Sequence, residues 1–425
     1  MAEMSWLMVL MTALSQGAGN DLLDYADGLT YWQQQGVEQT VEALTEQLKA
    51  EPQGEESAQA ASVRRLLAIR TLGELKDRRA LAALTALTND RDPFVAEYAR
   101  QAIATIEGKP FARPRPTDAA MESDVALLPA GCATVVQMRL PTGSHVSYDK
   151  VFEAMGDAAK DLDRKTVLRE LTGTILDLAA RTGNIRIDGV TVGLAGDVGD
   201  DTGFVVIVGR GRYDAAAVRA MLKDLCEDVR TVGNLEVFPP DDGVAILCPS
   251  DDRFVFIAGP NADVLPISKV VAALGGKGGG VLDDAEMTRL MRSVDRTQPV
   301  WAVAKVTETY RQAPLLAPFN TLTLVGEQTD DAIRLKLTAR GDDPQKIREQ
   351  VKVFEDDRAE ALKEMKKEAG EMPFMKDLIA GVEGMKTQVT GNEATVTATF
   401  KGKLGLLLPL IMGSVHSEAR EVPVE

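Results

Sequence analysis

Hydrophobic and polar positions follow two different periods along this chain. From residue 21 to residue 107 apolar side chains recur every three or four positions, as in Val37, Val41, Leu44 and Leu48, which is the spacing of one face of an α-helix. Beyond residue 122, short runs rich in valine, isoleucine and threonine alternate with helical runs. The pattern predicts an all-helical N-terminal region followed by an α+β region.

The expected elements of the second region are bounded by clusters of glycine, proline and aspartate. The expected strands are residues 133–140, 185–194, 203–208, 235–238, 244–248, 254–258, 300–306, 321–325, 333–338 and 386–400, the last split by a turn at Gly391 and Asn392. The expected helices are residues 151–180, 214–228, 262–274, 284–294 and 344–368.

The helical pattern of the first region repeats at a constant spacing. Ala68, Leu72 and Leu75 recur as Ala99, Ile103 and Ile106, with a second helix expected between them over residues 80–87. A period of about 30 residues that contains a helix, a turn and a helix is the signature of a stacked helical repeat. Small alanines let neighbouring helices pack closely, and Asp90 and Asp92 are placed to cap the helix that follows.

Residues 58–107 resemble the short HEAT repeats of bacterial proteins. The resemblance lies in Leu72-Gly73, in the turn Asn89-Asp90-Arg91-Asp92-Pro93, and in Val95 at the start of the next helix. It implies a helical solenoid whose outer ridges bind protein partners. About two units are present, fewer than the three that stability usually needs, so we expect the repeat to lean on residues 21–49 or on the downstream region.

A proline-containing stretch follows the repeat. Residues 108–122 include Pro110, Pro114 and Pro116, which disfavour a helix and suit an extended linker. We place the domain boundary there.

The α+β region contains an internal duplication. Residues 191–211 match residues 321–341 at a constant offset of 130. The identical pairs are Thr191/Thr321, Leu194/Leu324, Gly196/Gly326, Asp200/Asp330, Asp201/Asp331, Arg210/Arg340 and Gly211/Gly341. Each copy is expected to form a hairpin followed by a helix. We therefore predict two similar α+β subdomains packed together, with mostly antiparallel sheets and helices on one face.

The predicted fold class is α+β, with an N-terminal HEAT-like repeat and a duplicated α+β region. The second region is similar to uncharacterised duplicated domains of exported bacterial proteins, a resemblance that implies no activity. The predicted organisation is a signal peptide over residues 1–19, a HEAT-like domain over 20–107, the linker over 108–122, a first α+β copy over 123–275, a second copy over 281–413, and a polar tail over 414–425.

The formal net charge of -16 disfavours anionic binding partners. It repels the phosphates of nucleic acid and anionic lipid, so nucleic acid is not an expected partner. The chain is 45% hydrophobic and 26% charged, as folded proteins usually are, and its 425 residues are enough for two or three folding units.

The N-terminus predicts export. Residues 6–14 are an apolar run followed by small residues at 15 and 17–19, the layout of a signal peptide, although Glu3 rather than a basic residue precedes the run. We predict a periplasmic or secreted protein; the alternative is a cytoplasmic protein whose N-terminal helix docks on the body. No later stretch approaches the roughly 18 apolar residues of a membrane span. The nearest, residues 404–412, contains Pro409 and is expected to be a docking helix.

Candidate chemistry is sparse. Cys132, Cys226 and Cys248 show no chelating spacing and are expected to be buried free thiols, with one disulfide as the alternative in an oxidising compartment. The chain has two histidines, His145 and His416, too few for a multi-histidine metal site.

Three further motifs fit structural roles better than catalysis. Asp201-Thr202-Gly203 has the letters of an aspartic protease triplet but reads better as a hairpin turn. Residues 275–280 (GGKGGG) lack the Ser or Thr of a phosphate loop and are expected to be a hinge between the copies. The aspartate pairs at 241/242, 251/252 and 283/284 resemble those at 200/201 and 330/331 and are expected at turns and helix starts rather than around calcium. We assign no catalytic, cofactor-binding or metal-binding residue.

These features favour a non-enzymatic protein-binding or scaffold protein that uses its HEAT-like helices, and the expected partner is a protein. The alternative is a module that binds a small ligand or an amphiphile between the duplicated copies. A third possibility is an enzyme whose carboxylates meet only in the fold.

Overall fold

The computed structural model describes residues 21–49, 51–52, 56–113, 115–140, 164–196, 203–262, 265–277, 280–329, 332–368 and 373–401. The predicted signal peptide, the apolar stretch 404–412 and the polar tail 414–425 lie outside the described residues. No helix of the described ranges is long and apolar enough to cross a membrane.

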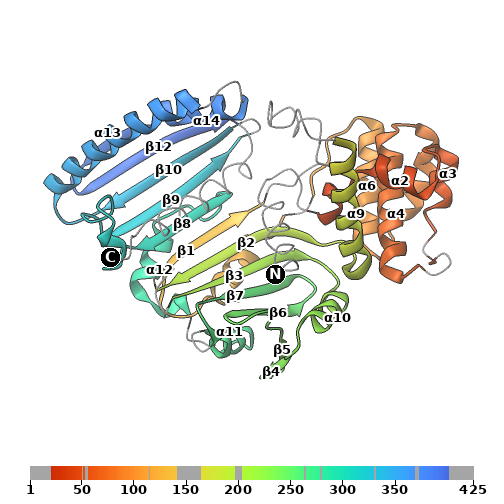
Figure 1. Cartoon of the computed structure of the whole chain (residues 1–425), viewed down its shortest axis with the longest axis horizontal. Helices are drawn as coiled ribbons and strands as arrows, with labels where there is room; N and C mark the ends of the chain where they lie inside the picture. Colours follow the sequence, from red (N-terminus) through yellow and green to blue (C-terminus); the bar gives the residue numbers. More distant parts are fainter. Residues whose placement is uncertain are drawn as a thin grey trace.

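The N-terminal region is helical, as predicted (Figure 1). Its elements are η1 (Leu22–Tyr25), α2 (Gly28–Gln35), α3 (Val41–Glu46), α4 (Ala58–Glu74), η2 (Arg78–Ala80), α5 (Leu81–Leu87) and α6 (Pro93–Glu107). Asp92 caps α6 by accepting hydrogen bonds from the amides of Phe94 and Val95. The assignment of these helices to the HEAT family stays a prediction.

The small residues of the helical region have a packing role. A Cβ on Gly73 of α4 would lie 2.9 Å from the Cα of Ala102 on α6, closer than carbon atoms normally approach. The two helices therefore meet where the sequence places glycine against alanine. Leu67 and Leu72 of α4 are fully buried around this contact.

Ten strands form one continuous sheet. They are β1 (Cys132–Arg139), β2 (Arg186–Ala195), β3 (Phe204–Arg212), β6 (Val244–Ser250), β7 (Arg253–Ala258), β8 (Val300–Lys305), β9 (Thr321–Gln328), β10 (Ala332–Arg340), β11 (Lys386–Thr390) and β12 (Glu393–Lys401). The order is β11-β12-β10-β9-β8-β1-β2-β3-β7-β6, and every pair is antiparallel. A small hairpin is formed by β4 (Arg230–Val232) and β5 (Leu235–Val237). The predicted α+β class with mostly antiparallel strands is confirmed.

The duplication is visible in the strand order. Read outward from the centre, one half runs β1, β2, β3, β7, β6 and the other runs β8, β9, β10, β12, β11. The prediction of two subdomains packed together is wrong in one respect, because the halves share a single sheet. The pairing of β1 with β8 removes an exposed edge from each half, which accounts for the difference.

A pseudo-twofold axis passes between Val135 and Val303. Val135 pairs with Gly193 of β2, and Val303 pairs with Thr323 of β9. Gly193 and Thr323 are equivalent positions of the two sequence copies. The two valines are therefore equivalent, and they pair with each other across the seam between β1 and β8.

Helices cover both faces of the sheet, so the prediction of helices on one face is wrong. On one face α10 (Ala215–Leu225) and α13 (Pro344–Glu368) cover the outer strands, with α14 (Pro373–Glu383) beside α13. On the other, α7 (Asp118–Val125), α11 (Ile267–Leu274) and α12 (Ala285–Arg292) pack against the valine-rich centre. The described elements also include the short 3-10 turns η5 (Val281–Asp283) and η6 (Tyr310–Gln312).

The predicted linker begins where α6 ends, but its predicted end at residue 122 is wrong. Helix α7 begins at Asp118, because the hydroxyl of Thr117 accepts a hydrogen bond from the amide of Ala120 and caps it. The side chain of Arg113 is 3% exposed and forms ion pairs, so this part of the segment is fixed to the body rather than extended into solvent.

Helix α9 (Arg164–Thr182) crosses the predicted domain boundary. It falls within the expected helix 151–180 of the first α+β copy, yet it packs against η1, α2 and α4 of the helical region (Figure 1). The helical region and the first half of the sheet thus share one hydrophobic core, which includes Leu23, Trp32, Ala179 and Ile187.

Candidate functional site

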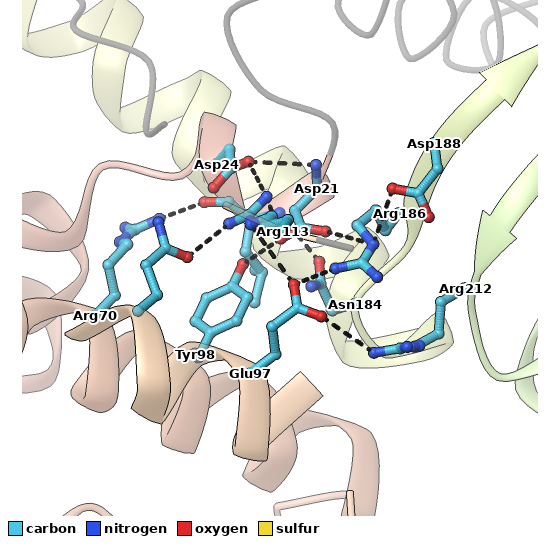
Figure 2. Close-up of polar contacts among 12 residues, drawn as sticks. Asp21, Asp24, Arg70, Glu97, Tyr98, Arg113, Asn184, Arg186, Asp188 and Arg212 are labelled. Carbon is cyan, nitrogen blue, oxygen red and sulfur yellow. Dashed lines mark hydrogen bonds and ion pairs between the residues drawn. The ribbon is translucent and has the colours of Figure 1, made fainter. Parts of the chain in front are cut away.

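A buried network of ion pairs joins the helical region to the sheet, and it is the most concentrated set of charges among the described residues. Its members come from η1, α6, the segment before α7, and strands β2 and β3 (Figure 2). The segment at Asp21 forms a β-bridge with Arg186, and the amide of Leu22 donates to the carbonyl of Ile185 at 2.7 Å. Residues 21 and 22 therefore lie beside the start of β2.

Arg113 holds the acidic side chains of η1. Its Nη1 lies 2.9 Å from Oδ2 of Asp21 and 3.2 Å from Oδ2 of Asp24, while Nη2 donates to Gln101 at 3.1 Å. The carboxylates of Asp21 and Asp24 are 0% and 2% exposed. Charges taken this far from water need partners, and one planar guanidinium group provides them for both.

Arg186 and Glu97 form the second centre of the network. Nη1 of Arg186 is ion-paired with Glu97, and its Nε lies 3.2 Å from Oδ1 of Asp188 on the same strand. Arg212 of β3 approaches the other oxygen of Glu97 at 3.5 Å. The ring of Phe94 stacks under both guanidinium groups, with centroid distances of 5.8 and 5.5 Å. Glu97 thus links α6 to β2 and β3 through ion pairs.

Further hydrogen bonds extend the network. The hydroxyl of Tyr98 donates to Oδ2 of Asp21 at 3.0 Å, and Arg70 of α4 donates to the carbonyls of Leu23 and Ala26. The side-chain oxygen of Asn184 accepts from the amide of Leu23 at 3.2 Å. Helices α4 and α6 and the start of β2 are therefore fixed to the same short turn, η1.

Burial makes some carboxyl groups of the network hold their protons more tightly. Among the described residues, Asp21, Asp24, Glu97 and Asp188 lie beside the guanidinium groups of Arg113, Arg186 and Arg212. Burial and then the charge of Asp24 raise the pKa of Asp21 to about 7, outweighing Arg113 and Arg186. Burial likewise raises the pKa of Asp188.

Asp21 makes stability depend on pH. Its pKa is 3.8 in the absence of these interactions and higher in the fold, so the folded state holds the proton more tightly than the unfolded chain. Its contribution is present below about pH 4 and is lost as the pH rises through about 7. We expect Asp21→Asn to reduce this loss, as measured by urea unfolding between pH 4 and pH 8. Asp295→Asn is the control, because the pKa of that exposed carboxyl is lowered by Thr297 and Gln298; an equal change in both variants would contradict the assignment.

A second buried ion pair joins Arg210 of β3 to Asp124 of α7. Asp124 of α7 accepts hydrogen bonds from Nε and Nη2 of Arg210 at 2.6 Å, and Nε of Arg253 lies 3.0 Å away. Arg340, the duplicate of Arg210, instead pairs with Glu393 at the surface. The same arginine is therefore buried in one half and exposed in the other.

Those sequence motifs that fall within the described ranges do not meet at a common site. Asp284 caps α12, and Asp251 accepts from the amide of Ala215 at the start of α10, as expected for helix starts. Gly276 follows α11 with φ 72°, and Gly280 forms a β-bridge with Pro129 of the other half. Asp201, Thr202, His145 and His416 lie outside the described residues. Within the described ranges, no group of three or more His, Cys, Asp or Glu could hold a metal ion.

The three cysteines are buried free thiols, as predicted. Burial raises the pKa of Cys132 to about 12 and that of Cys248 to about 11. Their thiolates are scarce at neutral pH, which fits packing rather than chemistry.

The sequence contains signals of the network that lie outside the motifs considered above. Arg186 and Asp188 stand two positions apart in a strand whose other residues, apart from Thr191, are apolar, which indicates a buried charge pair. Glu97 lies on α6 between Phe94, Val95 and Tyr98, which are all buried. The spacing of these residues along the chain does not reveal that they meet.

Known proteins resemble this chain in structure only. No family model matches the chain, and no curated protein matches it. Among solved structures, three crystal forms of TP0453 are similar. Form I has a TM-score of 0.37 and 11% identity, and covers 69% of this chain and 97% of TP0453. Form III has a TM-score of 0.38 and 12% identity, and the match covers 68% of this chain and 97% of TP0453. Form IV has a TM-score of 0.37 and 11% identity, and the match covers 68% of this chain and 95% of TP0453.

Proposed function

We propose that this chain is an exported, non-enzymatic scaffold protein that binds a protein partner on the outer surface of its HEAT-like helices. The observation that supports the proposal is the buried network. It attaches α6 to β2 and β3 through Glu97 and so fixes the helices to the sheet. A rigid surface loses little conformational entropy when a partner binds it.

The outward side of α5 is the proposed contact. Ala82, Thr85 and Ala86 are exposed and recur at helical spacing, while Leu84 on the inward side is fully buried. Small side chains on an exposed helix let a partner approach closely. Their ridge is the feature that the resemblance to HEAT repeats implies.

Paired surface variants test this assignment. The double variant Ala82→Arg, Ala86→Arg adds bulk and charge to the ridge without touching the core. We expect the amount of partner recovered with it to fall at least tenfold. The measurement is crosslinking and affinity purification from the native cell, with partner recovery quantified by mass spectrometry. Deleting residues 58–107 is unsuitable, because it removes Glu97 and Tyr98 and opens the network.

The control places the same substitution elsewhere. Ala359 on α13 is an exposed alanine of a helix far along the chain. Ala359→Arg should retain every partner of the native chain. Partners retained by the double variant, or lost equally in the control, would contradict binding on α5. Sequencing of the mature N-terminus after cell fractionation tests export separately.

A second candidate function is amphiphile binding at the seam of the sheet. A row of paired apolar side chains crosses the strands from β10 to β3: Leu337, Leu324, Ala302, Val136, Val192 and Ile207. These side chains are half-buried or, for Leu337, 37% exposed, whereas Val135 and Val303 on the other face are at most 1% exposed. Organic extraction of the same purified protein, analysed for co-purifying lipid, tests this candidate; a protein free of lipid would exclude it.

A further inference from the structure

A pocket of about 510 Å³ lies within the helical region, apart from the α5 ridge and from the seam. It forms where α2, the N-terminal half of α4 and α9 converge. The neighbouring helices α2 and α4 and the distant helix α9 thus build one cavity. Its volume is within the range of pockets that hold small ligands.

The walls of the pocket are held in place by buried groups. Arg64 donates to both carboxylate oxygens of Glu56 and to the carbonyls of Gln47, Lys49 and Glu51. The ring of Tyr31 packs edge-on against Trp32 with a centroid distance of 4.7 Å. Trp32 is fully buried and donates its indole N–H to Thr71 at 2.9 Å. The pocket is therefore shaped before any ligand arrives.

Gly173 of α9 lines the pocket, and no packing contact with the described residues requires a glycine there. Glycine inside a helix is unfavourable, and Gly73 and Gly381 are explained by neighbours at 2.9 and 2.2 Å from an added Cβ. A Cβ on Gly173 would meet no heavy atom of the described residues within 4 Å. The missing side chain keeps space open at the wall of the pocket, at the expense of helix stability.

The lining selects a neutral ligand rich in hydroxyl groups. The charge of Arg64 is neutralised by Glu56, so the described lining residues offer no free cation to an anion. The amides of Gln34, Gln35 and Gln47 both donate and accept hydrogen bonds, and Tyr31 adds an aromatic ring. Asp177 at the rim accepts only. We propose that this pocket binds a neutral saccharide of one or two rings.

Saturation-transfer NMR on the full chain tests the proposal. The probes are a panel of neutral mono- and disaccharides and one anionic sugar, glucuronate. We expect transfer to at least one neutral sugar and at least tenfold weaker binding of glucuronate. Gly173→Leu introduces a good helix former, so it should raise the melting temperature of the protein. Its side chain fills the open space, so the affinity for the sugar should fall at least tenfold.

The variants separate blocking from unfolding. Ala359→Leu on exposed α13 is the matched control and should bind like the native chain. A variant that is more stable yet does not bind cannot have lost the ligand by unfolding. No transfer to any neutral sugar, unchanged transfer in Gly173→Leu, or equal binding of glucuronate would each overturn the proposal.

Discussion

Arg186→Ala is expected to lower the free energy of unfolding by about 3–5 kcal/mol, the usual effect of removing one partner from a buried ion pair. The guanidinium group is 2% exposed and faces Glu97 and Asp188. Without it Glu97 retains only contacts of 3.5 Å to Arg212 and 3.7 Å to Arg113 among the described residues. Urea unfolding followed by tryptophan fluorescence at pH 7 measures the change. Hydrogen exchange should rise first at η1 and at the start of β2, where the helical region meets the sheet.

Two controls separate burial from charge. Arg340→Ala breaks a 2.7 Å pair with Glu393 whose side chains are 56% and 31% exposed, and should cost less than about 1 kcal/mol. The double variant Arg186→Met, Glu97→Met replaces the buried pair with apolar side chains and should recover part of the loss. A cost for Arg186→Ala no larger than that for Arg340→Ala would show that the network does not join the two regions.

Trp301→Ala is expected to cost about 3–5 kcal/mol, because it removes a large side chain from a close-packed core. Trp301 lies on β8 beside the seam and is 1% exposed. Its indole N–H donates to Oε1 of Gln137 on β1 at 3.1 Å, and Nε2 of Gln137 donates to Met121 and Thr191. Loss of the indole therefore leaves both a cavity and an unpaired buried oxygen. Thermal and urea unfolding measure the effect.

A second variant separates the contribution of the indole hydrogen bond from that of the ring volume. Trp301→Phe keeps much of the volume but not the hydrogen bond, and should cost about 1–3 kcal/mol. Val353→Ala, at a side chain that is 48% exposed on α13, should cost about 0.5 kcal/mol or less. If Trp301→Ala unfolds no more easily than Val353→Ala, the halves are not held together at this point.

Local patterns were sufficient for most elements. Residues 344–368 were expected as a helix, and α13 has the same bounds. The turn at Gly391 and Asn392 separates β11 from β12 as expected. Alternation and helical spacing depend on near neighbours in the chain, so they survive folding with small shifts at the ends.

The constant sequence offset reveals the duplication, but only the fold explains why particular residues are the same in both copies. Both copies have glycine at this position because a Cβ would clash with a backbone oxygen. It would lie 1.8 Å from the oxygen of Arg186 at Gly211, and 2.0 Å from the oxygen of Pro318 at Gly341. The sequence showed the repeated glycine and could not show the carbonyl that faces it. The same holds for Arg210 and Arg340, which are identical in sequence and differ in burial.

By itself the sequence determined the α+β class, the helical N-terminal region and most of the strands, because these depend on periodicity among residues close in the chain. It also determined the repeat between the halves, through a constant offset. Only the tertiary structure decided that the halves share one sheet through Val135 and Val303, that α9 joins the helical region, and that Arg113, Glu97 and Arg186 meet. Such contacts depend on which surfaces bury one another, and side chains as far apart in the chain as Arg113 and Arg186 leave no regular spacing to read.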